Sequence, residues 1–68
     1  MVVFAAKILE LVGESRVSWE DAAKHAVREA SKAVKHITGV EVTHWTALVN
    51  GGEIVTYKAN VKVAFTDA

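Results

Sequence analysis

The sequence predicts an α+β domain in which a three-stranded antiparallel sheet folds over one helix. Three observations support this prediction. One long stretch has apolar residues at the three-and-four spacing of a helix, one strand-like stretch precedes it, and two strand-like stretches joined by a glycine turn follow it. The 68 residues leave no room for a second helix. We therefore expect one β-α-β-β domain spanning residues 1–68.

The helix is predicted to begin after Ser18. The Ser18 hydroxyl can accept from the free amides of the first turn, and Asp21 stands three residues later, as in a capping box. Gly39 follows the last periodic residue and is predicted to end the helix. Alanine dominates the apolar face, which therefore buries less area than a leucine face would. This face comprises Trp19, Ala22, Ala23, Ala26, Val27, Ala30, Val34 and Ile37.

The first strand is predicted over residues 2–12, ending at Gly13 and a polar turn of residues 14–16. Its apolar side chains fall on both faces, with Leu9 and Leu11 on one side. A strand that is apolar on both faces is expected to be covered on both. The helix covers only one face, so the other face requires another subunit. That other face carries Phe4, Ile8 and Val12.

The second strand is predicted over residues 40–49, a hairpin turn over residues 50–52 and the third strand over residues 53–65. A right-handed crossover, with the third strand antiparallel between the other two, gives the strand order 1-3-2. Alternation places two sets of residues toward the helix: Tyr57, Ala59, Val61, Val63 and Phe65 of the third strand, and Val40 and Val42 of the second. The same alternation places Gly39, Glu41, Thr43 and Trp45 on the opposite face.

Composition indicates a protein that self-associates. A chain of this length buries only about 60% of its unfolded surface when it folds alone. There is no cysteine for a disulfide, and no run of His, Asp and Glu has the spacing of a structural metal site. With 51% hydrophobic residues, some apolar surface is expected to face a partner subunit.

Charge and hydropathy exclude other partners. The formal net charge is zero, with eight basic and eight acidic residues, so neither nucleic acid nor an anionic membrane is expected to bind. The longest apolar run is too short to span a bilayer, and no basic region precedes the apolar N-terminal residues. We expect a soluble cytoplasmic protein.

No catalytic constellation is present, so an enzyme is not predicted. There is no cysteine nucleophile and no glycine-rich loop with phosphate-binding spacing. His25 and His36 stand eleven residues apart on the predicted helix, too far for one metal ion, and His44 lies in the second strand. These histidines are interpreted as solvent-facing or hydrogen-bonded; convergence of one histidine from several copies on a symmetry axis is the alternative.

The sheet face opposite the helix holds the candidate binding residues. Trp45 is interpreted either as an anchor at a subunit interface or as a plate on which a flat ligand stacks. A polar set shares this predicted face and is either a group of cross-strand pairs or the rim of a pocket between subunits. The set comprises Glu41, Lys58, Asn60 and Lys62.

Three motifs resemble those of the dodecin family. The first strand ends E-L-V-G-E-S, the helix begins S-W-E-D-A-A, and the chain closes with Y-K-A-N-V-K-V-A-F. This resemblance covers nearly the whole chain. It implies a β-α-β-β subunit that assembles into a hollow homododecamer of cubic (23) symmetry and binds riboflavin or FMN between subunits, as a storage or protective carrier.

Two positions depart from the flavin-binding pattern of that family. The tryptophan that stacks on the flavin at the start of strand two is replaced by Gly39, and the glutamine in strand three by Lys58. Trp45 lies about 20 Å further along the strand, too far to act as the same stacking plate. Lysine donates hydrogen bonds but cannot accept them, as glutamine can.

The sequence therefore predicts a small-ligand-binding or storage protein with weak or altered flavin binding. The candidate cofactor contacts are Gly39, Glu41, Trp45 and Lys58, the candidate cofactor is riboflavin or FMN, and no metal ligand is assigned. The alternative is a structural or metal-ion-sequestering dodecameric shell without flavin.

Overall fold

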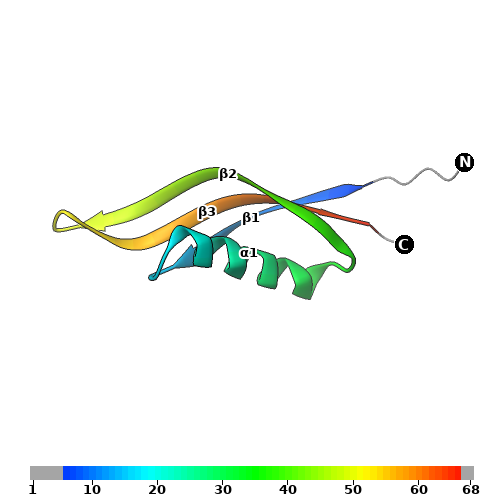
Figure 1. The fold of residues 1–68 in the computed structure, drawn as a ribbon, viewed down its shortest axis with the longest axis horizontal. Coiled ribbons are helices and arrows are strands. Elements are labelled where there is room, and N and C mark those ends of the chain that lie inside the picture. Colours follow the sequence, from blue (N-terminus) through cyan, green and yellow to red (C-terminus); the bar gives the residue numbers. More distant parts are fainter. Residues whose placement is uncertain (1–5, 67–68) are drawn as a thin grey trace, which may run out of the picture.

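The computed structural model describes residues 6–66 and has the predicted element order. Strand β1 (Lys7–Ser15) is followed by helix α1 (Trp19–Ala33), strand β2 (Ile37–Asn50) and strand β3 (Glu53–Phe65). The sheet order is β1-β3-β2 and both pairings are antiparallel, as predicted. Figure 1 shows α1 lying along one side of the sheet, with the β2–β3 hairpin reaching well beyond it.

The core lies between α1 and the central strand β3. It is built from small side chains, and the largest that are fully buried are Val61 and Val63. Leu9 and Leu11 of β1 pack against this core, whereas Ile8 and Val12 are exposed on the other face, as the alternation predicts. The small residues let the helix approach the sheet closely, but they bury little apolar area. The buried set is Ala22, Ala26, Ala30, Ala59, Val61 and Val63.

The predicted end of the first strand is wrong. β1 continues through Ser15, which pairs with Tyr57 of β3, so residues 14 and 15 belong to the strand rather than to a turn. Gly13 is buried within the strand, where the helix crosses it closely. A Cβ at Gly13 would collide with the carbonyl oxygen of Ala22 and lie 2.8 Å from the Ala26 Cβ. Residues 2–5 of the predicted strand, including Phe4, lie outside the described residues.

The helix begins as predicted, but half of its capping box differs. Ser18 Oγ accepts from the Asp21 amide at 3.0 Å. The Asp21 carboxylate turns toward Ser15, whose Oγ donates to it at 2.6 Å, instead of reaching back to the Ser18 amide. The Ser18 amide points to Ser15 Oγ at 3.4 Å. Ser15, from the preceding strand, thus replaces one side of the box.

The predicted end of the helix is wrong. The last helical residue is Ala33, and the amide of Val34 donates to the Ala30 carbonyl at 2.9 Å. The chain reverses at His36, which adopts a left-handed φ of 55°. The reversal therefore occurs at His36, three residues before Gly39, and Gly39 lies inside β2. Pairing of Ile37 with Phe65 of β3 takes this part of the chain into the sheet.

The β2–β3 hairpin closes through Gly51 and Gly52, with φ values of 61° and 79°. Positive φ at both positions is the geometry of a tight two-residue hairpin turn, and glycine adopts it without a side-chain clash. The last β1 pair is Ser15 with Tyr57, so neither β1 nor the core of the domain accompanies the hairpin beyond that point. We call residues 48–56 the arm. The chain measures 57 × 19 × 13 Å along its principal axes, far from a sphere.

Candidate functional site

The face of the sheet turned away from α1, here called the outward face, carries rows of polar side chains across the three strands. In one row, Lys62 of β3 stands between Glu10 of β1 and Glu41 of β2, and its Nζ lies 3.7 Å from Glu10 Oε1. In another row, Lys58 Nζ lies 3.8 Å from Glu14 Oε1. Glu41 and Lys58 thus lie on the face predicted for them, and Lys58 faces a carboxylate within its own chain.

Gly39 lies at one end of this face, on the edge strand β2. It pairs with Ala64 and is exposed. No atom comes within 4 Å of the position that its Cβ would occupy. Its φ lies outside the left-handed region, so the backbone accepts any L-residue here. The surface at Gly39 is therefore open, with room for a large side chain or a ligand ring.

The prediction that Trp45 shares this face is wrong. A register shift between Val42 and His44 leaves Thr43 as an extra residue in β2, and such a bulge reverses which face the following side chains occupy. Trp45 pairs with Ala59, which is fully buried against the helix, so Trp45 lies on the helix side of the sheet. His44 takes the outward position, opposite Asn60.

On the helix side, Trp45 forms a cleft with Trp19, the first residue of α1. The cleft has a volume of about 390 Å³ and is lined by these two rings. Trp19 Nε1 donates to the Thr46 carbonyl at 2.8 Å, and its ring meets Tyr57 edge-on with centroids 4.8 Å apart. The Trp19 ring is thereby fixed, whereas Trp45 remains 52% exposed.

The four predicted contact residues therefore divide between two faces. Gly39, Glu41 and Lys58 lie on the outward face, and Trp45 lies on the other. The aromatic cleft is the feature that the sequence missed. Its two tryptophans are 26 positions apart, and only the bulge at Thr43 brings them to the same side.

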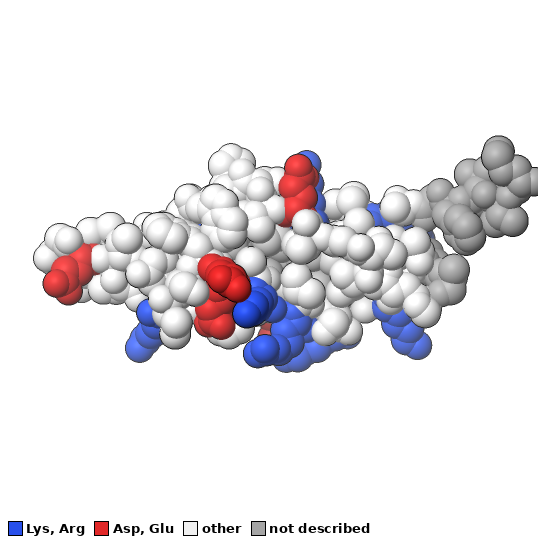
Figure 2. All heavy atoms as spheres, viewed as in Figure 1, with Lys and Arg blue, Asp and Glu red and all other residues white. Residues whose placement is uncertain are grey.

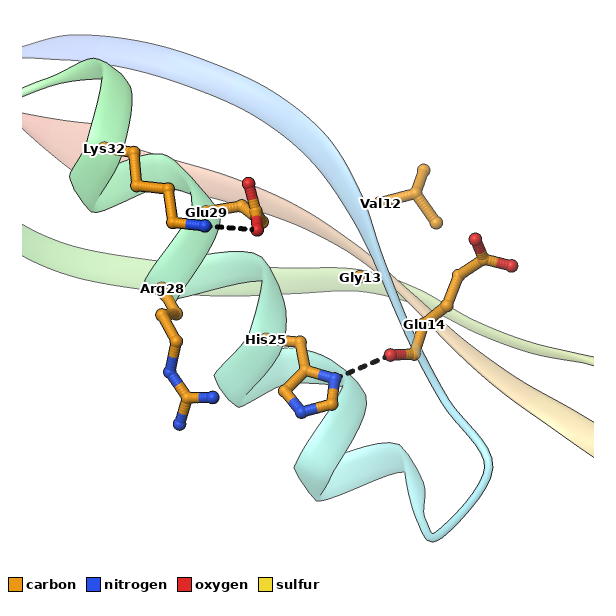
Figure 3. Close-up of a pocket in the computed structure, with 7 residues that line it drawn as sticks. All are labelled: Val12, Gly13, Glu14, His25, Arg28, Glu29 and Lys32. Carbon is orange, nitrogen blue, oxygen red and sulfur yellow. Dashed lines mark hydrogen bonds and ion pairs between the residues drawn. The ribbon is translucent and has the colours of Figure 1, made fainter.

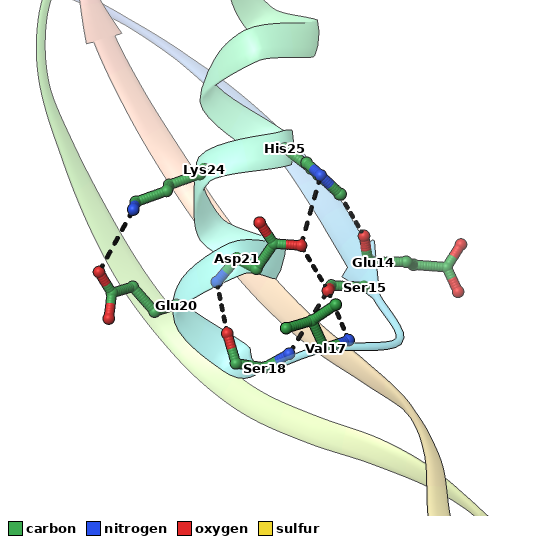
Figure 4. A network of polar contacts seen from close by, with 8 residues as sticks. All are labelled: Glu14, Ser15, Val17, Ser18, Glu20, Asp21, Lys24 and His25. Atoms are coloured by element: carbon green, nitrogen blue, oxygen red, sulfur yellow. Dashed lines mark hydrogen bonds and ion pairs between the residues drawn. The ribbon is translucent and has the colours of Figure 1, made fainter.

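A polar network surrounds the first turn of α1 (Figure 4). The Asp21 carboxylate accepts from Ser15 Oγ at 2.6 Å and lies 3.4 Å from His25 Nε2. Activation of a serine nucleophile requires its proton to be directed at a base such as imidazole. Here the Ser15 proton is directed at the carboxylate, while the imidazole faces Asp21 and the Glu14 backbone carbonyl. This network joins the strand to the helix and has no nucleophile geometry.

A groove of about 510 Å³ runs between the free edge of β1 and α1 (Figure 3). Its charged groups are of both signs and several are already paired. His25 Nδ1 lies 2.8 Å from the Glu14 carbonyl, and Lys32 Nζ lies 3.0 Å from Glu29 Oε1. A ligand would have to compete with these contacts, so the groove is a weaker candidate than the outward face. It is lined by Val12, Gly13, Glu14, His25, Arg28, Glu29 and Lys32.

Residues 6–66 hold neither a metal-binding cluster within one chain nor a helix that could cross a membrane. Within that range, no three His, Asp or Glu side chains of one chain come together in a group that could hold a metal ion. His36 lies in the loop after α1 and not on the helix, while His44 lies on the outward face. The single helix in that range is too short and too polar to cross a membrane.

A β-α-β-β subunit with order β1-β3-β2, an alanine-lined helix on one sheet face and an exposed second face defines a class of small α+β proteins. The family is shown directly. A sequence model of the dodecin family matches residues 5–67, and the chain belongs to that family.

Two comparisons support this assignment. Calcium dodecin of Mycobacterium tuberculosis is 32% identical over 59 residues, which cover 87% of this chain and 83% of the relative. The crystal structure of calcium dodecin from the same species, described as calcium-chelating with a novel calcium-binding site, matches with a TM-score of 0.80 at 32% identity over 94% of this chain and 91% of that one.

A third comparison concerns the fold alone. Dodecin from Streptomyces coelicolor matches with a TM-score of 0.93 over 100% of this chain and 97% of that one. The identity is 24%, so the backbone is retained while most side chains differ.

Proposed function

We propose that this protein binds a small ligand between the subunits of a homododecamer, against the outward face. The observation that carries the proposal is the open surface at Gly39, where no atom lies within 4 Å of a Cβ position on an exposed edge strand. A flavin-binding dodecin places its stacking tryptophan at this point. The surface has space for a flat ring but supplies no aromatic plate for it.

The polar groups of the same face also favour weak or altered flavin binding. Lys58 and Lys62 lie 3.8 and 3.7 Å from the carboxylates of Glu14 and Glu10. A ligand that uses either ammonium group must share it with its glutamate, and an ammonium group accepts no hydrogen bond. The mixed donor and acceptor edge of an isoalloxazine is therefore only partly matched.

Titration with riboflavin and FMN tests the proposal through flavin fluorescence. We expect the unchanged protein to quench either flavin only weakly at micromolar concentration. Gly39→Trp restores an aromatic plate and is expected to increase quenching strongly, because an indole ring stacked on the isoalloxazine donates an electron to its excited state. Gly39→Ala is the matched control, which fills the same open position with a methyl group and leaves binding unchanged.

Two results would contradict this proposal. Equal quenching by Gly39→Trp and Gly39→Ala would show that the ligand does not use the outward face at Gly39. Tight binding of riboflavin by the unchanged protein would refute the weakened flavin site.

The second candidate is a shell that sequesters metal ions. Glu10, Glu14 and Glu41 all lie on the outward face, and carboxylate oxygens are the ligands that Ca²⁺ prefers. One copy gathers no sufficient group within residues 6–66, so a Ca²⁺ site requires carboxylates from more than one copy. Calorimetric titration with calcium chloride separates the candidates: saturable uptake that is lost in Glu41→Gln but kept in Glu53→Gln favours the shell.

A further inference from the structure

The arm leaves one apolar side of the sheet uncovered. The helix side of the hairpin carries Trp45 beside the start of α1 and, by alternation along β2, Ala47 and Val49 further toward the turn. Val49 pairs with Ile54, so the two share that side. Val49 is 64% exposed and Ile54 is 44% exposed. The helix side of the hairpin therefore has the Trp19–Trp45 cleft at one end and an exposed aliphatic pair, Val49 and Ile54, at the other. We call this pair the tip.

The tip and the cleft cannot meet within one chain. Four residues of extended strand separate Trp45 from Val49, a distance of about 13 Å along β2. The paired strands hold that separation rigidly. An apolar partner for the cleft must come from another molecule.

The scarcity of charged residues on the hairpin limits the class of molecule that can cover the cleft. Between Glu41 and Lys58 the only formally charged residue is Glu53. In Figure 2 the hairpin end of the molecule is mainly uncharged surface, whereas the basic groups gather nearer the helix. A strip without charge offers no electrostatic attraction to a polyanion or to a basic peptide. It matches a surface that is itself apolar and uncharged. The helix side of another arm's tip is such a surface, because Glu53 pairs with Asn50 on the outward side.

The exposed area of the cleft indicates whether one tip in one cleft is a stable contact by itself. Trp19 and Trp45, 36% and 52% exposed, together offer roughly 200 Å² of aromatic surface to a partner. A stable two-body interface needs about 800 Å² from each partner, so a single tip in a single cleft is too small to act alone. If each copy gives its tip to one neighbour and its cleft to another, the contact is used twice per subunit and closes into a ring.

We propose that the tip of the arm, Val49 and Ile54, inserts into the Trp19–Trp45 cleft of a neighbouring copy of this chain. This inference rests on the self-assembly part of the proposed function and names the surfaces that perform it. It uses the helix side of the sheet and leaves the outward face, with Gly39, to the ligand. The head-to-tail contact is compatible with the three-fold axes of a 23 assembly.

Tryptophan accessibility tests the inference, because both tryptophans of the chain line the cleft. Acrylamide quenching and the emission maximum are measured with the full chain, alongside mass by sedimentation velocity. In the unchanged protein we expect shielded tryptophans and an oligomeric mass. Val49→Lys places a charge in the contact and is expected to increase quenching severalfold, shift emission to the red and reduce the mass.

Leu48→Lys is the matched control. Leu48 is the neighbouring residue, 49% exposed, and lies on the outward side of the arm. It receives the same charge and is expected to leave the tryptophans shielded. Trp45→Ala removes one wall of the cleft and is expected to weaken assembly more than ligand binding. Circular dichroism shows whether each variant keeps its fold.

The outcomes separate this inference from the proposed function. An oligomer in which Val49→Lys leaves the tryptophans as shielded as before means that something other than the tip fills the cleft, and the inference falls while the ligand proposal stands. Exposure by Leu48→Lys but not by Val49→Lys would place the contact on the outward face. A single-subunit mass for the unchanged protein would overturn both the inference and the dodecamer.

Discussion

Two glycines of this chain occupy opposite environments. Gly13 lies where β1 passes under α1, and the helix backbone fills the space that a side chain would need. Gly39 lies on an open edge with nothing nearby. The first glycine is required by packing, and the second is a free position that can be changed without cost to the fold. The residue type at position 39 therefore matters for ligand binding and not for stability.

Substitution of these glycines by alanine gives the prediction at this scale. Gly13→Ala is expected to lower the free energy of unfolding by about 3 kcal/mol, because its methyl group meets a backbone carbonyl that cannot move independently. Gly39→Ala is expected to change it by less than about 0.5 kcal/mol. Urea unfolding at equal subunit concentrations measures both. Equal stability of the two variants would contradict the close approach of α1 to β1.

At the scale of elements, the junction between β1 and α1 depends on one hydroxyl group. Ser15 is 6% exposed and uses its Oγ three times: it donates to Asp21 and accepts from the amides of Val17 and Ser18. These contacts take up amides that the turn and the helix start would otherwise leave without a partner. The strand end and the helix start are thus fixed to each other.

Removal of that hydroxyl tests the junction. Ser15→Ala is expected to lower the free energy of unfolding by about 1–3 kcal/mol, since buried partners lose their hydrogen bonds. Ser31→Ala is the matched control: its hydroxyl donates to the Arg28 carbonyl on the exposed side of α1, so little change is expected. Thermal unfolding followed by far-ultraviolet circular dichroism compares them. If Ser31→Ala lost as much stability as Ser15→Ala, the claim that the Ser15 hydroxyl specifically stabilises the β1–α1 junction would be wrong.

For the whole molecule, the small core and the long arm both reflect where the apolar side chains lie: small ones fill the core, and large ones are exposed on the arm. The buried apolar side chains of the core are alanines and valines, while Leu48, Val49, Ile54 and Val55 of the arm are 43–64% exposed. The radius of gyration is 14.1 Å, whereas a compact domain of this length has about 11 Å. Apolar area that other domains bury inside is here exposed on the arm. Under the proposed assembly neighbouring subunits cover this area, so stability is expected to depend on protein concentration.

The native mass tests this view. Size-exclusion chromatography with multi-angle light scattering is expected to give twelve times the 7.4 kDa subunit mass. Dilution is expected to lower the melting temperature as subunits dissociate. A mass of one subunit, or a melting temperature that is independent of concentration, would contradict assembly as the source of stability.

Local chemistry in the sequence determined the element order, the strand order, the bounds of β3, the helix start at Ser18 and the glycine turn. The elements and their turn depend on neighbours in the chain: alternation along a strand, a hydroxyl three residues before an amide, and glycines with positive φ. The strand order follows from the right-handed crossover between β1 and β2. The outward placement of Glu41 and Lys58 followed from the same alternation.

Only the tertiary structure decided where β1 ends, where α1 ends and which side Trp45 faces. Pairing with β3 extended β1 through Ser15, and the chain reverses at His36, with a left-handed φ, instead of ending the helix at Gly39. One extra residue at Thr43 moved Trp45 to the helix side. Register across strands is set by the partner strand, and a shift of a single residue reverses every side chain that follows. No pattern within one strand carries that information.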